Sequence, residues 1–147
     1  MRGEKRIMDI EVYHKCFDIC DKVRAARAGK EIRMRDYPAA IVSCADSWQN
    51  YRDNVIESSG KSNALSYKKT PVLESALLTL GDIGKQRSGC KNYIGACAEP
   101  HAARTVMMTA SVPDVKNLAF SYAYRPRTKT VLRYCRNCTD VFDVVNP

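Results

Sequence analysis

Two short cysteine motifs, far apart in the sequence, place the strongest restriction on how this chain can fold. The first covers residues 97–102, Cys-Ala-Glu-Pro-His-Ala, and the second covers residues 134–138, Tyr-Cys-Arg-Asn-Cys. Three thiols can hold one Zn²⁺ ion tetrahedrally and leave the fourth position open for water. Glu99 lies two residues after the first thiol, where it could serve that open position as a proton shuttle. We therefore expect the fold to bring Cys97, Cys135 and Cys138 together around one ion.

Other interpretations of the cysteines stay open. The chain has 7 Cys, an odd number, and no secretory signal at its start, so a complete disulfide framework is not expected. A closed four-cysteine zinc site could recruit Cys90, but it would leave Glu99 without a role. A cysteine nucleophile is a third possibility, and it has the least support because the chain has only 2 His, His14 and His101.

The composition indicates a single domain over residues 1–147. A hydrophobic content of 45% with only 6 Pro and 7 Gly is typical of a globular chain. We expect an N-terminal helical segment over residues 1–34 and a zinc-binding core over residues 35–147. No apolar run approaches the ~20 residues of a membrane span, and the first residues lack the apolar core of a signal peptide. No membrane partner is therefore expected.

Hydrophobic spacing and turn residues predict interspersed helices and strands. A continuous apolar run between Pro38 and Asp46 predicts a buried strand over residues 39–44. Thr70 and Pro71 suit the N-cap and the first position of a helix. The other expected elements are helices over 7–28, 97–112 and 139–145, strands over 48–56 and 118–124, and loops over 58–63, 81–95 and 125–130. This order predicts an α/β fold of three layers, α/β/α, with a small mixed central sheet.

Charge and aromatic residues point to a polyanionic partner. The chain has 24 Lys and Arg against 16 Asp and Glu, a net charge of +8 that favours DNA or RNA, although it could also serve solubility. Tyrosines and cations alternate before the second motif, as in proteins that stack unpaired bases. Tyr122 and Tyr124 could instead belong to the strand core, and His101 could pack on a helix face. The candidate substrate-binding residues are His101, Tyr124, Arg125, Arg127, Arg133 and Tyr134.

The two motifs resemble those of a known family. Residues 95–102, Gly-Ala-Cys-Ala-Glu-Pro-His-Ala, are similar to the C-A-E-P block of the YwqJ-like deaminases of bacterial polymorphic toxin systems, which belong to the cytidine-deaminase-like superfamily. Residues 135–138 are similar to the C-x-N-C end of that family's second block. The resemblance covers roughly residues 35–147. It implies a cytidine-deaminase-like fold, zinc bound by Cys97, Cys135 and Cys138, and Glu99 as the proton shuttle.

The same resemblance implies a biological setting. It suggests hydrolytic deamination of a nucleobase in DNA or RNA, with cytosine to uracil expected first and adenine left open. It also suggests a toxin effector that acts in the cytoplasm of a target cell and meets a cognate immunity protein. Two alternatives remain: a deaminase of free nucleosides or nucleotides, and a non-catalytic zinc-containing module that binds nucleic acid.

Overall fold

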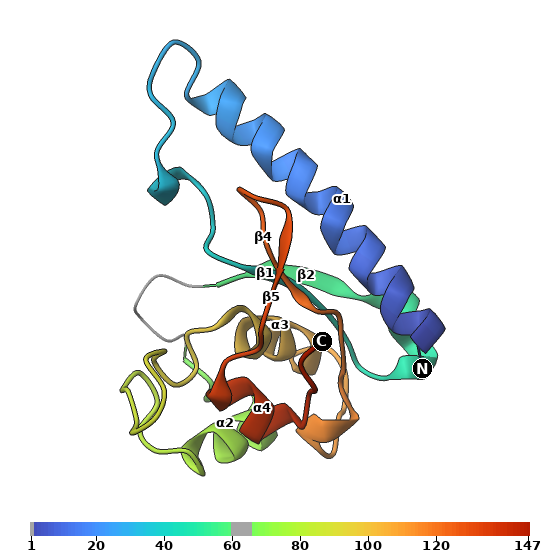
Figure 1. The fold of residues 1–147 in the computed structure, drawn as a ribbon. Helices are drawn as coiled ribbons and strands as arrows, with labels where there is room; N and C mark the ends of the chain where they lie inside the picture. The colour runs from blue at the N-terminus through green and yellow to red at the C-terminus, as the bar shows by residue number, and fades with distance from the viewer. Residues whose placement is uncertain (1, 60–65) are drawn as a thin grey trace.

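Five short strands form one antiparallel sheet at the centre of the protein (Figure 1). The computed structural model describes residues 2–59 and 66–147. The strand order is β2-β1-β4-β5, and β3 also pairs with β1. The strands are β1 (Ile41–Ala45), β2 (Val55–Ser58), β3 (Ala119–Phe120), β4 (Ala123–Arg125) and β5 (Thr130–Leu132). The predicted mixture of helices and strands is thus confirmed.

The expectation of a mixed sheet is wrong, because every pairing among the described strands is antiparallel. A short connection over residues 46–54 turns the chain back from β1 to β2, and a tight turn joins β4 to β5. Lys129 occupies the left-handed region in that turn, with φ of 58°. Connections this short suit antiparallel neighbours, whereas a parallel pair needs a long crossover.

The central strand β1 is buried along its whole length, as its apolar sequence predicts. Because side chains alternate along a strand, its residues serve two separate cores. Val42 and Cys44 belong to the larger core, which the later helices share. Ile41 and Ala45 point to the opposite face and pack against the first helix.

That first helix, α1 (Arg2–Ala26), lies across one face of the sheet (Figure 1). Met8, Val12 and Cys16 are buried beneath it at spacings of four residues, the stripe that an amphipathic helix presents to a core. The helix starts about one turn before the predicted residue 7. Lys5 explains part of this extension, since its ammonium group donates to the carbonyl oxygen of Phe120 at 2.9 Å and fixes the first turns.

Three helices cover the opposite face: α2 (Pro71–Leu78), α3 (Ala98–Met107) and α4 (Arg136–Phe142). Helix α2 begins at Pro71, as predicted. Helix α3 ends at residue 107 instead of 112, because the N–H groups of Thr109 and Ala110 both turn back to the carbonyl of Val106. Helix α4 runs over 136–142, where 139–145 was expected, so Cys138 lies within its first turn.

Three short 3₁₀ helices complete the structure: η1 (Met34–Asp36), η2 (Trp48–Asp53) and η3 (Val115–Asn117). Most of the strand expected over 48–56 is therefore 3₁₀ helix, and only its end joins β2. Trp48 and Tyr51 explain the difference, since both pack against the small core of Met8, Ala45 and Ala119.

The strand expected over 118–124 is divided into β3 and β4. Between them the N–H group of Tyr122 leaves the sheet and donates to the Asp9 carboxylate at 2.7 Å. From residue 60 onward, the loop expected over 58–63 lies outside the described residues. No helix within residues 2–59 and 66–147 has the length and apolar character needed to cross a membrane.

Candidate metal centre

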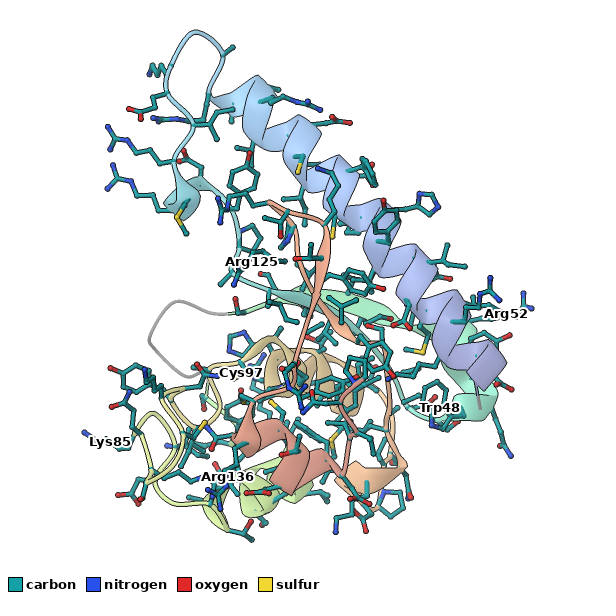
Figure 2. All side chains as sticks on the ribbon, in the orientation of Figure 1. Trp48, Arg52, Lys85, Cys97, Arg125 and Arg136 are labelled. Atoms are coloured by element: carbon teal, nitrogen blue, oxygen red, sulfur yellow. The ribbon has the colours of Figure 1, made fainter. Side chains whose placement is uncertain are left out.

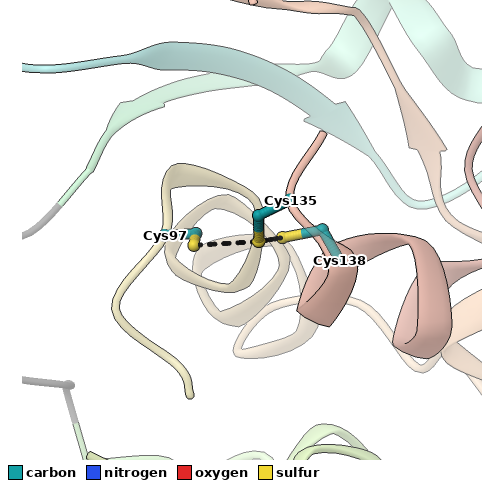
Figure 3. Close-up of side chains that lie close together, drawn as sticks. All are labelled: Cys97, Cys135 and Cys138. Atoms are coloured by element: carbon teal, nitrogen blue, oxygen red, sulfur yellow. Dashed lines mark hydrogen bonds between the residues drawn. The ribbon is translucent and has the colours of Figure 1, made fainter. Parts of the chain in front are cut away.

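The three cysteines of the two motifs meet at the N-terminal ends of α3 and α4 (Figure 3). Cys97 is the N-cap residue of α3, Cys135 is the N-cap residue of α4, and Cys138 follows in the first turn of α4. The positive end of a helix dipole favours negative groups, so two helix ends together favour thiolates here. The local sequence thus places the sulfurs at two helix N-termini, where the electric field of the helix dipoles stabilises thiolates.

The spacing of the sulfurs fits one metal ion. The Sγ atoms of Cys97 and Cys135 lie 3.4 Å apart, and those of Cys135 and Cys138 lie 3.5 Å apart. All three lie within 4.8 Å of one another. Tetrahedral zinc–thiolate bonds place sulfurs about 3.8 Å apart, close to these distances. The three cysteines could therefore hold a metal ion, as predicted, and Cys90 is not a member of the group.

The thiols share protons unequally. Hydrogen bonds with Cys138 and Cys97 lower the pKa of Cys135 well below its ordinary value. The contact with Cys135 raises the pKa of Cys97 and of Cys138. A cation placed between the sulfurs would take over the role of those shared protons, since a metal binds the ionised form of each thiol.

Glu99 adds a carboxyl group beside the sulfurs. It lies in the first turn of α3, is only 4% exposed, and accepts a hydrogen bond from the Cys138 thiol over 3.3 Å, measured from Sγ to Oε2. Burial raises the pKa of Glu99 to about 7. A carboxyl group with a pKa in that range can both accept and release a proton at neutral pH.

A cleft of about 550 Å³ opens beside this group. Such a volume lies within the range of small-molecule sites. Cys97, Glu99 and Cys135 line the cleft, so the metal centre is accessible from it. Small side chains form much of its wall and leave room for a flat ring: Ala39, Ala40, Ala96, Ala98 and Ala123.

The predicted substrate-binding residues separate into two groups. Arg125 and Arg133 line the cleft. Arg127 is exposed in the turn between β4 and β5 and does not line it. Tyr124 alternates with Ala123 and Arg125 along β4, so its side chain lies on the opposite face and packs with the core beneath α1.

His101 and Tyr134 are buried away from the cleft. The Nδ1 atom of His101 lies 3.2 Å from the carbonyl oxygen of Ser58, so this residue links α3 to β2. The Tyr134 hydroxyl donates to the carbonyl of Ser121 at 2.5 Å and accepts from Lys5 at 3.0 Å. Tyr134 is therefore a core residue that ties the segment before α4 to the first turns of α1.

The loop before α3 contributes residues that the sequence did not indicate. Lys91, Asn92 and Tyr93 line the cleft. Asn137, between the two cysteines of the second motif, holds this loop in place, because its Nδ2 donates to the carbonyl of Asn92 at 3.1 Å. Its Oδ1 accepts from Arg87 Nε at 2.7 Å. Only the position of the loop directly before Cys97 could have indicated that it borders the site.

Comparisons with protein-family models, with curated proteins and with solved structures found no match to this chain.

Proposed function

We propose that this protein is a zinc-dependent hydrolase that deaminates a nucleobase, with cytosine to uracil in DNA or RNA as the first expectation. One observation carries the proposal. The buried carboxyl group of Glu99 lies beside three sulfurs that could bind one ion, and Glu99, Cys97 and Cys135 line a cleft with room for a nucleobase. A purely structural zinc site has no need of an acid at this place.

Zinc is the ion that best suits three thiolates with a fourth position free, and when bound it would supply a Lewis acid that makes water ionise near neutral pH. Cys97, Cys135 and Cys138 would hold it. The hydrolysis replaces the exocyclic amine of the base with oxygen from water and releases ammonia. The small alanine side chains would admit the flat ring.

Glu99 has the place and the proton affinity to manage the proton transfers. Its carboxylate would take a proton from the attacking water and pass it to the ring nitrogen of the base. It would then transfer the second proton to the departing amine, so ammonia leaves as a neutral molecule. Burial supports both steps, because it makes the Glu99 carboxylate a stronger base than an exposed glutamate.

The setting of this activity follows from the resemblance of the two motifs. We propose a toxin effector domain that acts on nucleic acid in a target cell and that a cognate immunity protein neutralises. The net charge of +8 supports a nucleic-acid substrate. The three thiolates favour one competing function, a non-catalytic zinc module, because their combined negative charge weakens zinc as a Lewis acid.

The decisive experiment uses the zinc-loaded protein with single- and double-stranded DNA and RNA and with free nucleosides. Sequencing of the polymers and chromatography of the nucleosides detect conversion of cytosine to uracil or of adenine to hypoxanthine. We expect turnover by the wild-type protein and loss of turnover by at least 100-fold in Glu99→Gln. Elemental analysis should find the same zinc content in both. Absence of base conversion on every substrate, at full zinc content, would favour the non-catalytic module.

A further inference from the structure

We propose that Lys91, Tyr93, Arg125 and Arg133 form a rim around the cleft that binds an unpaired stretch of nucleic acid. In this arrangement the three cations contact backbone phosphates, and Tyr93 stacks on a base. The inference rests on the proposed function, because the rim would hold the strand whose base enters the cleft. It assigns a specific substrate surface, made of two segments far apart in the sequence.

The three cations are free to meet a ligand. Lys91, Arg125 and Arg133 are exposed and line the cleft. Their side chains make no hydrogen bond or ion pair with any other residue in the described part of the chain. Two nearby arginines differ in this respect, since Arg87 and Arg136 both pair with Asp140.

The rim carries uncompensated positive charge. Glu99 is the one acidic residue among the described residues that line the cleft, and it is buried at the metal centre. The mouth of the cleft therefore presents cations without acidic neighbours among its lining. Such a surface attracts a polyanion, whose bound counterions are released when it binds. A neutral nucleoside has no counterions to release.

The cations come from two sides. Lys91 lies in the loop before α3, while Arg125 is on β4 and Arg133 directly follows β5. Both segments line the same cleft beside Cys97. A strand in the cleft could thus contact cations of both segments through the phosphates that flank the base next to the metal centre.

Tyr93 supplies an aromatic surface on this rim. It is 38% exposed, and its hydroxyl has no hydrogen-bond partner among residues 2–59 and 66–147. Large exposed aromatics beside free cations are the usual elements of single-strand binding, because every base has a face that can stack. Asn137 donates to the carbonyl of Asn92, the residue before Tyr93, and so anchors the loop that carries Tyr93.

The depth of the metal centre requires the base to be unpaired. Glu99 is 4% exposed and lies at the inner end of the cleft, so a base must enter the cleft to reach it. A base within a duplex is stacked and paired, and it would have to leave the helix at an energetic cost. The rim should therefore bind single strands more tightly than duplexes of the same sequence.

The test measures binding, independently of turnover. A fluorescein-labelled single-stranded oligonucleotide of about 12 nucleotides and of mixed sequence is titrated with zinc-loaded protein, and fluorescence anisotropy gives Kd at several salt concentrations. Each of Lys91→Gln, Arg125→Gln and Arg133→Gln should raise Kd severalfold. Each should also reduce the slope of log Kd against log salt by about 0.7, the value for one lost phosphate contact on a single strand.

Matched variants separate the rim from general charge and from misfolding. Tyr93→Ala should raise Kd about tenfold or more, whereas Tyr93→Phe, which keeps the ring, should bind like the wild type. Arg52→Gln removes one positive charge far from Cys97 (Figure 2) and should change neither Kd nor the salt slope. Circular dichroism and zinc content confirm that each variant is folded.

Two results would overturn the inference: rim variants that bind with wild-type Kd and salt slope, or a duplex competitor that binds as tightly as the single strand. Neither result tests deamination itself, because turnover of free nucleosides would still be measurable. Conversely, loss of binding in the rim variants together with no base conversion by the wild type would retain the rim and reject the deaminase.

Discussion

Cys97 and Cys135 occupy equivalent positions in two different helices. Each is an N-cap residue, with φ and ψ of −72° and 167° at Cys97 and of −72° and 164° at Cys135, and their sulfurs lie 3.4 Å apart. The starts of α3 and α4 therefore converge on one point although they are separated by 38 residues. An ion at this point would join the two helices, so metal binding and folding should be coupled.

This coupling predicts which cysteines the metal needs. Cys97→Ser, Cys135→Ser or Cys138→Ser should lower the zinc content from about one ion per protein to near zero, because two remaining sulfurs are too few for a stable site. Each should also lower the melting temperature, since bound metal stabilises the folded state by mass action. Elemental analysis and thermal unfolding measure both effects.

Cys90→Ser is the matched control. It should keep the zinc content and melting temperature of the wild type, because Cys90 lies outside the three-sulfur group. Loss of zinc in Cys90→Ser would instead support the closed four-cysteine site. Treatment of the wild-type protein with a chelator should reproduce the lower melting temperature of the ligand variants.

A second prediction concerns the stability of the fold and rests on the buried side chain of Asn137. The side chain is 3% exposed and bonds both Arg87 and the backbone of Asn92. Asn137→Ala leaves these partners unsatisfied and should lower the free energy of unfolding by about 1–3 kcal/mol. Asp140→Asn removes a more exposed partner of Arg87 and should cost at most about 1 kcal/mol. Urea denaturation of the zinc-loaded proteins compares the two, and equal losses would contradict the role given to Asn137.

The candidate metal ligands were predictable because each of the two motifs is short. The C-x-x-C spacing places Cys135 and Cys138 about one helical turn apart, although the helix starts three residues earlier than expected, and Glu99 follows Cys97 by two residues. The apolar run of β1 was equally local, since continuous burial needs no knowledge of its neighbours. Where a short segment carries its own chemistry, the sequence was a sufficient guide.

The walls of the cleft depend on long-range pairing, which the sequence does not show. Tyr124 and Arg125 are adjacent on β4 and so lie on opposite faces of the sheet, but only the pairing of β4 with its neighbours decides which of the two faces the cleft. Tyr134 precedes Cys135 but is held in the core in part by Lys5, which lies 129 positions earlier in the sequence. The loop over 81–95 has no periodicity at all, so Lys91 and Tyr93 could not be assigned to a surface.

The environment of His101 predicts a dependence of stability on pH. Its Nδ1–H donates to the carbonyl of Ser58, while the buried Nε2 has no partner among the described residues. Burial lowers the pKa of His101 below its ordinary value of 6.5. The unfolded chain therefore takes up a proton as pH falls below 6.5, the folded protein does not, and the free energy of unfolding decreases.

His101→Asn tests this effect, because the asparagine amide can replace Nδ1–H and does not titrate. Urea denaturation is compared at pH values on both sides of 6.5. We expect the wild type to lose more stability toward the lower pH than the variant loses. Since both proteins keep the same thiols, acid release of metal affects both alike and cancels in the comparison. Identical losses in the two proteins would contradict the predicted effect.

Tyr134 is the residue for which the sequence and the structure suggest the most different roles. The sequence placed it in a substrate-binding strip, whereas the structure buries it to 4% exposure with its hydroxyl between Ser121 and Lys5. Tyr134→Phe keeps the ring but removes the hydroxyl that bonds both the carbonyl of Ser121 and the ammonium group of Lys5. It should lower the free energy of unfolding by about 1–3 kcal/mol.

Tyr122→Phe is the matched control for Tyr134→Phe. The Tyr122 ring lies beside Tyr134 and under the Lys5 ammonium, but its hydroxyl bonds no other residue in the described part of the chain. This variant should keep wild-type stability within about 0.5 kcal/mol. Both variants should bind the labelled single strand with wild-type Kd, because neither residue lines the cleft. If Tyr134→Phe weakened binding without a loss of stability, Tyr134 would belong to the substrate surface after all.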